Sequence, residues 1–104
     1  MALSIVTSVN GESRVIRVSG EVDVSNKDEL NAAIASAQSE GAQEVEVDLS
    51  EVSYIDSSGI GVLVAAAHRA TDEDRRFFVS HPQRNVARVL SMLGMGAELG
   101  LATD

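Results

Sequence analysis

The chain has 104 residues, carries a formal net charge of −8, and is 44% hydrophobic but only 3% aromatic. This length suits a single domain over residues 1–104 with an aliphatic core, and the apolar content excludes a disordered protein. The absence of cysteine excludes disulfides and thiolate metal sites, and two histidines are too few for a histidine-based metal site. The acidic balance disfavours binding to nucleic acid or anionic membranes. No signal-peptide layout and no apolar run of the roughly 20 residues that a membrane helix needs are present, so a cytoplasmic location is expected.

The N-terminal part predicts two strands joined by a tight turn. Leu3 to Val9 and Arg14 to Ser19 have the composition of strands, and Asn10-Gly11 between them is a strong hairpin signal. The stretch Gly20 to Val24 follows as a predicted loop.

A helix and a half-buried strand are expected next. The hydroxyl of Ser25 is in position to cap the helix, apolar residues then recur at helical spacing, and Gly41 ends it. The alternation in Glu44 to Leu49 places aliphatic side chains on one face of a strand and three carboxylates on the other. A strand with one polar face indicates a sheet that helices cover mainly on its other face.

The second half of the chain continues to alternate strands and helices. Val52 to Ile55 is a short apolar run that leads into a helix ending near Thr71. Ser57 is the predicted cap of this helix, and Ser58 is its predicted first residue.

The remaining elements complete the predicted fold. Arg76 to Ser80 predicts a strand, and Pro82 suits the first turn of a helix that stops at Gly94. Glu98 to Ala102 is expected to add a short final strand. This order predicts an α/β domain with a mixed four- to five-stranded sheet and helices packed mainly on one face.

The segment Asp56-Ser57-Ser58-Gly59 connects a strand end to a helix start, where sites in α/β sheets tend to lie. The free amides and the dipole of a helix N-terminus tolerate negative charge, so a phosphate on Ser58 would be accommodated. The alternative is that the serines only cap the helix and the glycines only permit close packing. The residues alone leave both interpretations open.

The helix that follows has an uncharged outer side. The face expected to cover the sheet consists of Ile60, Leu63, Val64 and Ala67. Off that face lie Val62, Ala65 and Ala66, with Gly61 beside them, and this small-residue patch either meets a partner protein or is covered by the next helix.

Enzymatic alternatives fit the residues poorly. Ser58 lacks the Gly-x-Ser-x-Gly context of a hydrolase nucleophile, and His68 lies about three helical turns from Ser57. A phosphoacceptor role for Asp56 would require an acidic pair after the first strand and a late lysine, whereas the only lysine is Lys27.

Three segments resemble the anti-sigma factor antagonist family, which is built on the STAS domain. They are Gly20-Glu21-Val22-Asp23, the run from Val47 to Gly61, and Val89 to Met95. The segments occur in the order that the family has, and the resemblance spans about residues 3–101.

The resemblance implies a regulatory binding protein and kinase substrate rather than an enzyme, without a metal or cofactor. In such proteins the unphosphorylated form binds an anti-sigma factor, which is a serine kinase of the GHKL ATPase type, and thereby frees a sigma factor, as in stress responses. The kinase phosphorylates the serine before the motif glycine, which is Ser58 here, and the complex dissociates. A PPM-type serine phosphatase reverses the modification.

The resemblance also implies a partner-binding surface around the phosphorylated serine. Its expected residues are Asp23, Asp56, Ser57, Ser58, Gly59, Ile60 and Val62. The alternative is a non-switching STAS protein, either a stressosome scaffold or an accessory subunit of a lipid transporter, in which the same segment is a binding loop only.

Overall fold

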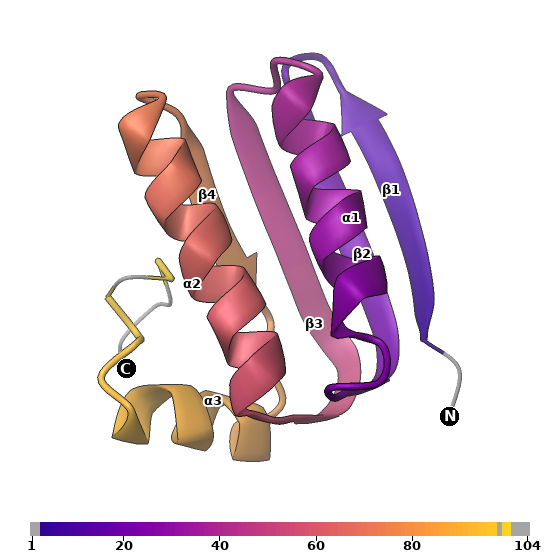
Figure 1. Ribbon diagram of the computed structural model, residues 1–104, viewed down its shortest axis with the longest axis vertical. Helices are drawn as coiled ribbons and strands as arrows, with labels where there is room; N and C mark the ends of the chain where they lie inside the picture. Colours follow the sequence, from indigo (N-terminus) through magenta and orange to yellow (C-terminus); the bar gives the residue numbers. More distant parts are fainter. Residues whose placement is uncertain (1–2, 98, 101–104) are drawn as a thin grey trace.

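The computed structural model describes residues 3–97 and 99–100. These residues form a mixed four-stranded sheet and three helices, which confirms the predicted α/β fold class. The elements are β1 (Ser4–Asn10), β2 (Ser13–Val22), α1 (Lys27–Ser39), β3 (Glu44–Ile55), α2 (Ser57–Asp72), β4 (Arg76–Ser80) and α3 (Arg84–Met92) (Figure 1).

The strands lie in the order β1-β2-β3-β4, with β1 antiparallel to β2 and the other two pairs parallel. The predicted hairpin is present: Asn10 pairs with Ser13, and Gly11 adopts a φ of 62°, which a residue without a Cβ adopts without strain. The parallel pairs require crossover connections, and α1 and α2 supply them.

α1 and α2 lie side by side on one face of the sheet, as Figure 1 shows. The alternation in β3 therefore has the predicted outcome, because Val45 and Val47 are buried beneath the helices while Glu46 faces the open side of the sheet. The core is aliphatic, and its fully buried large side chains are Ile16, Val18, Val22, Leu30, Ile34, Val45, Val47, Leu49, Val52, Leu63, Leu90 and Leu99.

Both central strands are longer than the sequence predicts. The prediction of a loop from Gly20 was wrong, because Gly20 to Val22 continue β2, where they pair with Val52 to Ile55 of β3. The predicted strand from Glu44 to Leu49 and the apolar run from Val52 to Ile55 form one strand of 12 residues, β3. The two extensions pair with each other, so each supplies the hydrogen-bond partners that the backbone groups of the other need.

Helix starts also differ from the prediction. Asn26 rather than Ser25 is the residue before α1, because Ser25 is occupied by hydrogen bonds to the carboxylate of Asp23. Asp56 rather than Ser57 caps α2. Pro82 precedes α3, which begins at Arg84, instead of forming its first turn.

α3 packs against the part of β3 that β4 leaves unpaired. β4 has five residues and ends opposite Asp48, so on this side the later carbonyls of β3 face no further strand of residues 3–97 and 99–100. The side-chain amides of Gln83 and Asn85 donate to the carbonyls of Ser50 and Ser53 at 3.0 and 2.8 Å. These side chains satisfy edge groups that would otherwise depend on water.

Most of the strand predicted over Glu98 to Ala102 lies outside the described residues. Leu99, which is described, has a buried side chain, and its carbonyl accepts a hydrogen bond from the amide of Val79 at 2.9 Å. The outer edge of β4 is therefore partly occupied.

The first turn of α2 lies unusually close to the strand ends. A Cβ on Gly59 would lie 2.7 Å from Cγ1 of Val22 and 2.8 Å from Cγ1 of Ile55, whereas a Cβ on Gly61 would meet nothing within 4 Å. We expect Gly59→Ala to lower the free energy of unfolding by about 1–3 kcal/mol through overpacking. Gly61→Ala is the matched control and should leave stability unchanged or raise it by up to about 1 kcal/mol, since alanine favours a helix.

Urea unfolding of both variants measures this difference. Equal stabilities for the two alanine variants would contradict the close approach of α2 to the strands.

Candidate functional site

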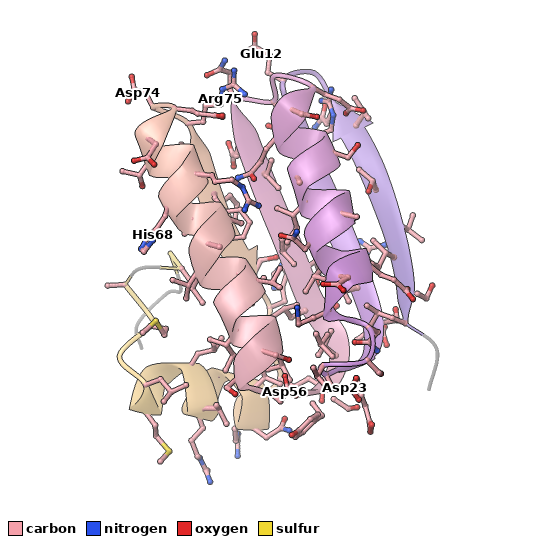
Figure 2. The ribbon with its side chains drawn as sticks, in the orientation of Figure 1. Glu12, Asp23, Asp56, His68, Asp74 and Arg75 are labelled. Carbon is pink, nitrogen blue, oxygen red and sulfur yellow. The ribbon has the colours of Figure 1, made fainter. Side chains whose placement is uncertain are left out.

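The ends of β2 and β3 define the candidate site. These strands are parallel, and their last residues Val22 and Ile55 are partners in the ladder. The next residue in each case is an aspartate, so Asp23 and Asp56 lie at the same edge of the sheet, at the N-terminus of α2 (Figure 2). Carboxyl ends of strands are where sites form in sheets of this kind.

The carboxylate of Asp56 is the centre of the hydrogen bonding at this edge. One oxygen, Oδ1, accepts from the hydroxyl of Ser58 at 2.6 Å and from the amides of Ser58 and Gly59 at 3.0 and 3.1 Å. The hydroxyl of Ser58 and the amide of Gly59 hold the pKa of Asp56 below its usual value, against a smaller opposing effect of desolvation. Asp56 is therefore a carboxylate at neutral pH, and it orients the hydroxyl of Ser58.

The loop around Asp23 is held by a second set of hydrogen bonds. The carboxylate of Asp23 accepts from the hydroxyl and amide of Ser25 at 2.5 and 2.9 Å, and these bonds lower its pKa. The charge of Asp56 acts in the opposite direction and raises the pKa of Asp23, so the two carboxylates affect each other. This edge of the protein is thus anionic before any modification.

Asn26 fixes this loop and was missed by the sequence prediction. Its side chain is buried, accepts from the amide of Asp23 at 2.9 Å and donates to the carbonyl of Glu21 at 2.8 Å. The sequence did offer a signal, because asparagine shortly after a strand often hydrogen-bonds to nearby backbone groups. The neighbouring Ser25 was instead chosen as the residue that caps the helix.

The structure separates the predicted partner-binding residues into two groups. Ser57 is exposed, and Asp23, Asp56, Ser58 and Val62 are half-buried. Gly59 and Ile60 are buried, so they position the surface from beneath.

Two apolar side chains that the prediction did not include flank this surface. Val24, in the loop that follows β2, is 70% exposed, and Tyr54, near the end of β3, is 50% exposed. Apolar side chains that are half or more exposed are common components of a protein interface. The sequence signal was position: Val24 directly follows Asp23, and Tyr54 lies two residues before Asp56.

The small-residue side of α2 is only partly covered. Gly61 and Ala65 are exposed, whereas Ala66 is buried on the side of α2 that adjoins α1. The side-chain amide of Gln38 in α1 donates to the carbonyl of Ala66 at 3.0 Å, which ties the two helices together. The helix that covers Ala66 is thus α1 and not, as the sequence suggested, the next helix along the chain, while Gly61 and Ala65 remain exposed.

One group of residues within the described chain has the composition of a cation site. Ligand atoms of Glu46, Asp48 and His81 lie within 4.8 Å of one another on the open side of the sheet. Glu46 already accepts from the hydroxyl of Ser80 at 2.6 Å, and Asp48 is 3.6 Å from the guanidinium of Arg17. These protein partners stabilise the carboxylates without an ion.

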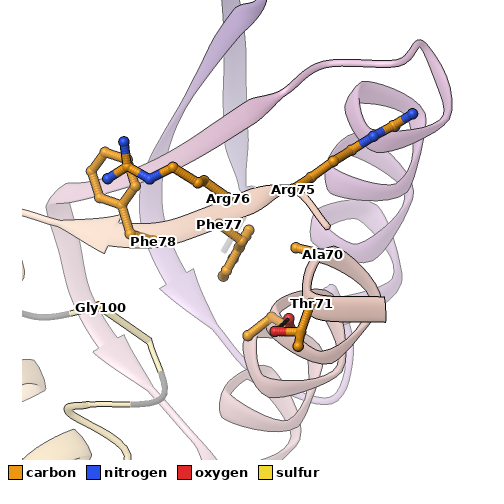
Figure 3. Close-up of a pocket in the computed structure, with 8 residues that line it drawn as sticks. Ala70, Thr71, Arg75, Arg76, Phe77, Phe78 and Gly100 are labelled. Atoms are coloured by element: carbon orange, nitrogen blue, oxygen red, sulfur yellow. Dashed lines mark hydrogen bonds between the residues drawn. The ribbon is translucent and has the colours of Figure 1, made fainter. Parts of the chain in front are cut away.

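A pocket of about 500 Å³ lies between α2 and β4, near the last turns of α2 (Figure 3). Its basic residues are already engaged: Arg75 donates to the carbonyl of Gln38 at 2.9 Å, and Arg76 lies over the ring of Phe78. Ser57 and Ser58 are at the opposite end of α2, so this pocket is separate from the candidate site.

The chain is a small α/β domain with a mixed sheet, helices on one face of that sheet, and two serines in the first turn of its second helix. A family model described as "Mlab, STAS domain" matches residues 5–102, and the chain belongs to the STAS domain family. No helix in the described part of the chain has both the length and the apolar character needed to cross a membrane.

Known relatives support the predicted resemblance. The chain is 28% identical over 95 residues to an anti-sigma-B factor antagonist of Staphylococcus epidermidis, covering 91% of this chain and 88% of the relative. The solved unphosphorylated form of the anti-sigma factor antagonist SpoIIAA is 27% identical, with a TM-score of 0.79 and coverage of 99% of this chain and 90% of that chain.

The Bacillus cell fate determinant SpoIIAA in its phosphorylated form is 26% identical, with a TM-score of 0.73 and coverage of 99% and 93%. The resemblance to anti-sigma factor antagonists is thus confirmed by relatives that carry that name.

The charge on Asp56 gives the site a defined pH dependence. Its pKa is lower in the folded chain than the usual value of 3.8, so its contribution to stability is present above that value and is lost as the pH falls through the folded pKa. Asp56→Asn retains an amide that can cap a helix but cannot carry the charge. We expect the variant to be less stable than the parent at pH 7, and the gap between them to narrow below about pH 4.

Urea unfolding at several pH values checks this expectation. Glu51→Gln removes one exposed negative charge elsewhere on β3 and is the control. A gap between Asp56→Asn and the parent that stays constant with pH would contradict the assigned role of the carboxylate.

Proposed function

We propose that this protein is an anti-sigma factor antagonist that works by partner switching. Its unphosphorylated form binds an anti-sigma factor, which is a serine kinase of the GHKL ATPase type, and so frees a sigma factor for transcription. Phosphorylation of Ser58 releases the protein, and a PPM-type serine phosphatase restores it. The observation that carries the proposal is the hydroxyl of the half-buried Ser58, held by Asp56 at the N-terminus of α2.

The geometry suits a phosphoacceptor serine. Ser58 is half-buried, and its hydroxyl lies in one orientation because it donates to the carboxylate of Asp56 at 2.6 Å. A kinase that docks on this edge meets a serine whose position is already fixed, which reduces the entropy lost on forming the reactive complex. Ser57 is more exposed but has no comparable hydrogen bond among the described side chains.

Phosphorylation reverses the sign of this local interaction. The hydroxyl proton that Ser58 donates to Asp56 is lost when oxygen becomes bonded to phosphorus, and the carboxylate then faces a group with about −1.5 to −2 charges. Asp23 adds a further negative charge at the same edge. The phosphate must therefore turn away from Asp56, toward the space that a docked partner occupies.

This displacement is sufficient to end binding without refolding the domain. Like-charge repulsion and desolvation at an interface cost several kcal/mol, and about 3 kcal/mol already lowers affinity more than a hundredfold. The α2 dipole meanwhile tolerates the phosphate within the protein's own structure.

Relatives support the same interpretation. Chains 26–28% identical to this one are named as antagonists of anti-sigma factors, and the phosphorylated state of one of them has been solved. The partner surface that we propose comprises Asp23, Asp56, Ser57, Ser58 and Val62, with Gly59 and Ile60 supporting it from beneath. This function places the protein in the cytoplasm with the transcription machinery.

The phosphorylation site can be tested by mass. We expect purified protein incubated with ATP and a lysate of its host to gain one phosphate, mapped to Ser58 by peptide analysis. Ser58→Ala should gain none, while Ser57→Ala is the matched control and should be modified like the parent. No phosphate on the parent, while a control kinase substrate in the same lysate is modified, would instead favour a non-switching scaffold or accessory STAS protein.

The switch can also be tested structurally. Circular dichroism and proton NMR of the phosphorylated protein should show an unchanged fold, with chemical-shift changes confined to residues near Asp23, Asp56 and Ser58. Affinity for the kinase partner should fall at least about a hundredfold. Broad loss of dispersed resonances would contradict a local electrostatic mechanism.

A further inference from the structure

β1 is a free edge of the sheet. In the order β1-β2-β3-β4 it has a neighbour on one side only, and Figure 1 shows no element of the described chain beyond it. The opposite edge differs, because the carbonyl of Leu99 accepts from the amide of Val79 on the outer side of β4. An edge strand presents backbone groups that are available to pair with another strand.

The register identifies which groups of β1 face outward. Asn10 and Ser13 pair across the two-residue hairpin turn, so they form a hydrogen-bonded pair. Such pairs alternate along an antiparallel ladder. The amides and carbonyls of Ile5, Thr7 and Val9 therefore point away from β2.

β1 lacks the features that normally protect an edge. It has seven residues, Ser-Ile-Val-Thr-Ser-Val-Asn, with no charge, no proline and an uninterrupted register. Val6 and Val9 are 58% and 66% exposed. In a chain with a net charge of −8, this strand brings no charged side chain of its own into contact with a second copy.

We propose that β1 pairs antiparallel with β1 of a second copy, around a two-fold axis through Thr7, so that the two sheets join into one. The strand is self-complementary in this register. Ile5 of one copy faces Val9 of the other on the helix-covered side, and Val6 faces Ser8 on the open side. Opposed β-branched side chains are among the cross-strand pairs that stabilise a sheet, and the contact is isologous, as a closed dimer requires.

This dimer leaves the candidate site free. Asp56 and Ser58 lie where β3 meets α2, and β2 separates them from the dimer edge. Each dimer would therefore present two accessible Ser58 sites, and the proposal does not depend on the function of that serine.

Sedimentation equilibrium of the full chain, from micromolar to millimolar concentration, tests the proposal. We expect the parent to form dimers in a concentration-dependent way. Thr7→Lys and Thr7→Glu each place two like charges opposite one another across the axis, so each should weaken dimerisation about tenfold or more. An equimolar mixture of the two variants should restore it, because lysine then faces glutamate.

Ser8→Lys is the matched control, since it adds the same charge to the same strand but faces Val6 of the second copy rather than another lysine. Its dimerisation should stay within a few-fold of the parent, and circular dichroism verifies that all variants are folded. The proposal is overturned if the parent is monomeric throughout. It is equally overturned if Thr7→Lys dimerises as strongly as Ser8→Lys, or if the mixture does not restore dimers.

Discussion

The contact on which the site depends is the close approach of the first turn of α2 to the ends of β2 and β3. Gly59 permits it, because any side chain there would occupy the space of Val22 and Ile55. That approach brings the amides at the start of α2 beside the two strand-end aspartates, so that Asp56 caps the helix and also holds the hydroxyl of Ser58. The glycine and the aspartate of the Asp-Ser-Ser-Gly segment thus have separate physical roles, one steric and one electrostatic.

The same contact links two segments that are far apart in the sequence. Val22 belongs to the Gly-Glu-Val-Asp segment, and its side chain is one of the two that exclude a Cβ at Gly59. The following residue, Asp23, consequently lies within electrostatic reach of Asp56. A chain that keeps one segment and loses the other would lose both the packing and the paired carboxylates, which gives a physical reason for the two to occur together.

The sequence was sufficient to predict the order of elements, the span of β4 and the position of the candidate serine, because hydrophobic periodicity and glycine positions encode these locally. It was insufficient where a long-range partner decides the outcome. Gly20 to Val22 look like a loop until β3 supplies their ladder partners, and Ser25 looks like a cap until Asp23 occupies it. Likewise, the sequence does not distinguish Asp56 from Ser57 as the cap of α2, since both can accept from backbone amides.

The two proposed contact surfaces differ in charge. At the candidate site Asp23 and Asp56 make the surface anionic, so a phosphate on Ser58 would add charge of the same sign where the hydroxyl now donates a hydrogen bond to Asp56. Along β1 the chain has no charged residue, so strand pairing there brings no like charges into direct contact. The anionic surface at Asp23 and Asp56 is one whose binding phosphorylation would end, whereas the neutral surface along β1 would remain unchanged by it. Because β1 is an outer strand and Ser58 lies in the first turn of α2, beyond β2 and β3, the association proposed through β1 leaves the release proposed at Ser58 free to occur.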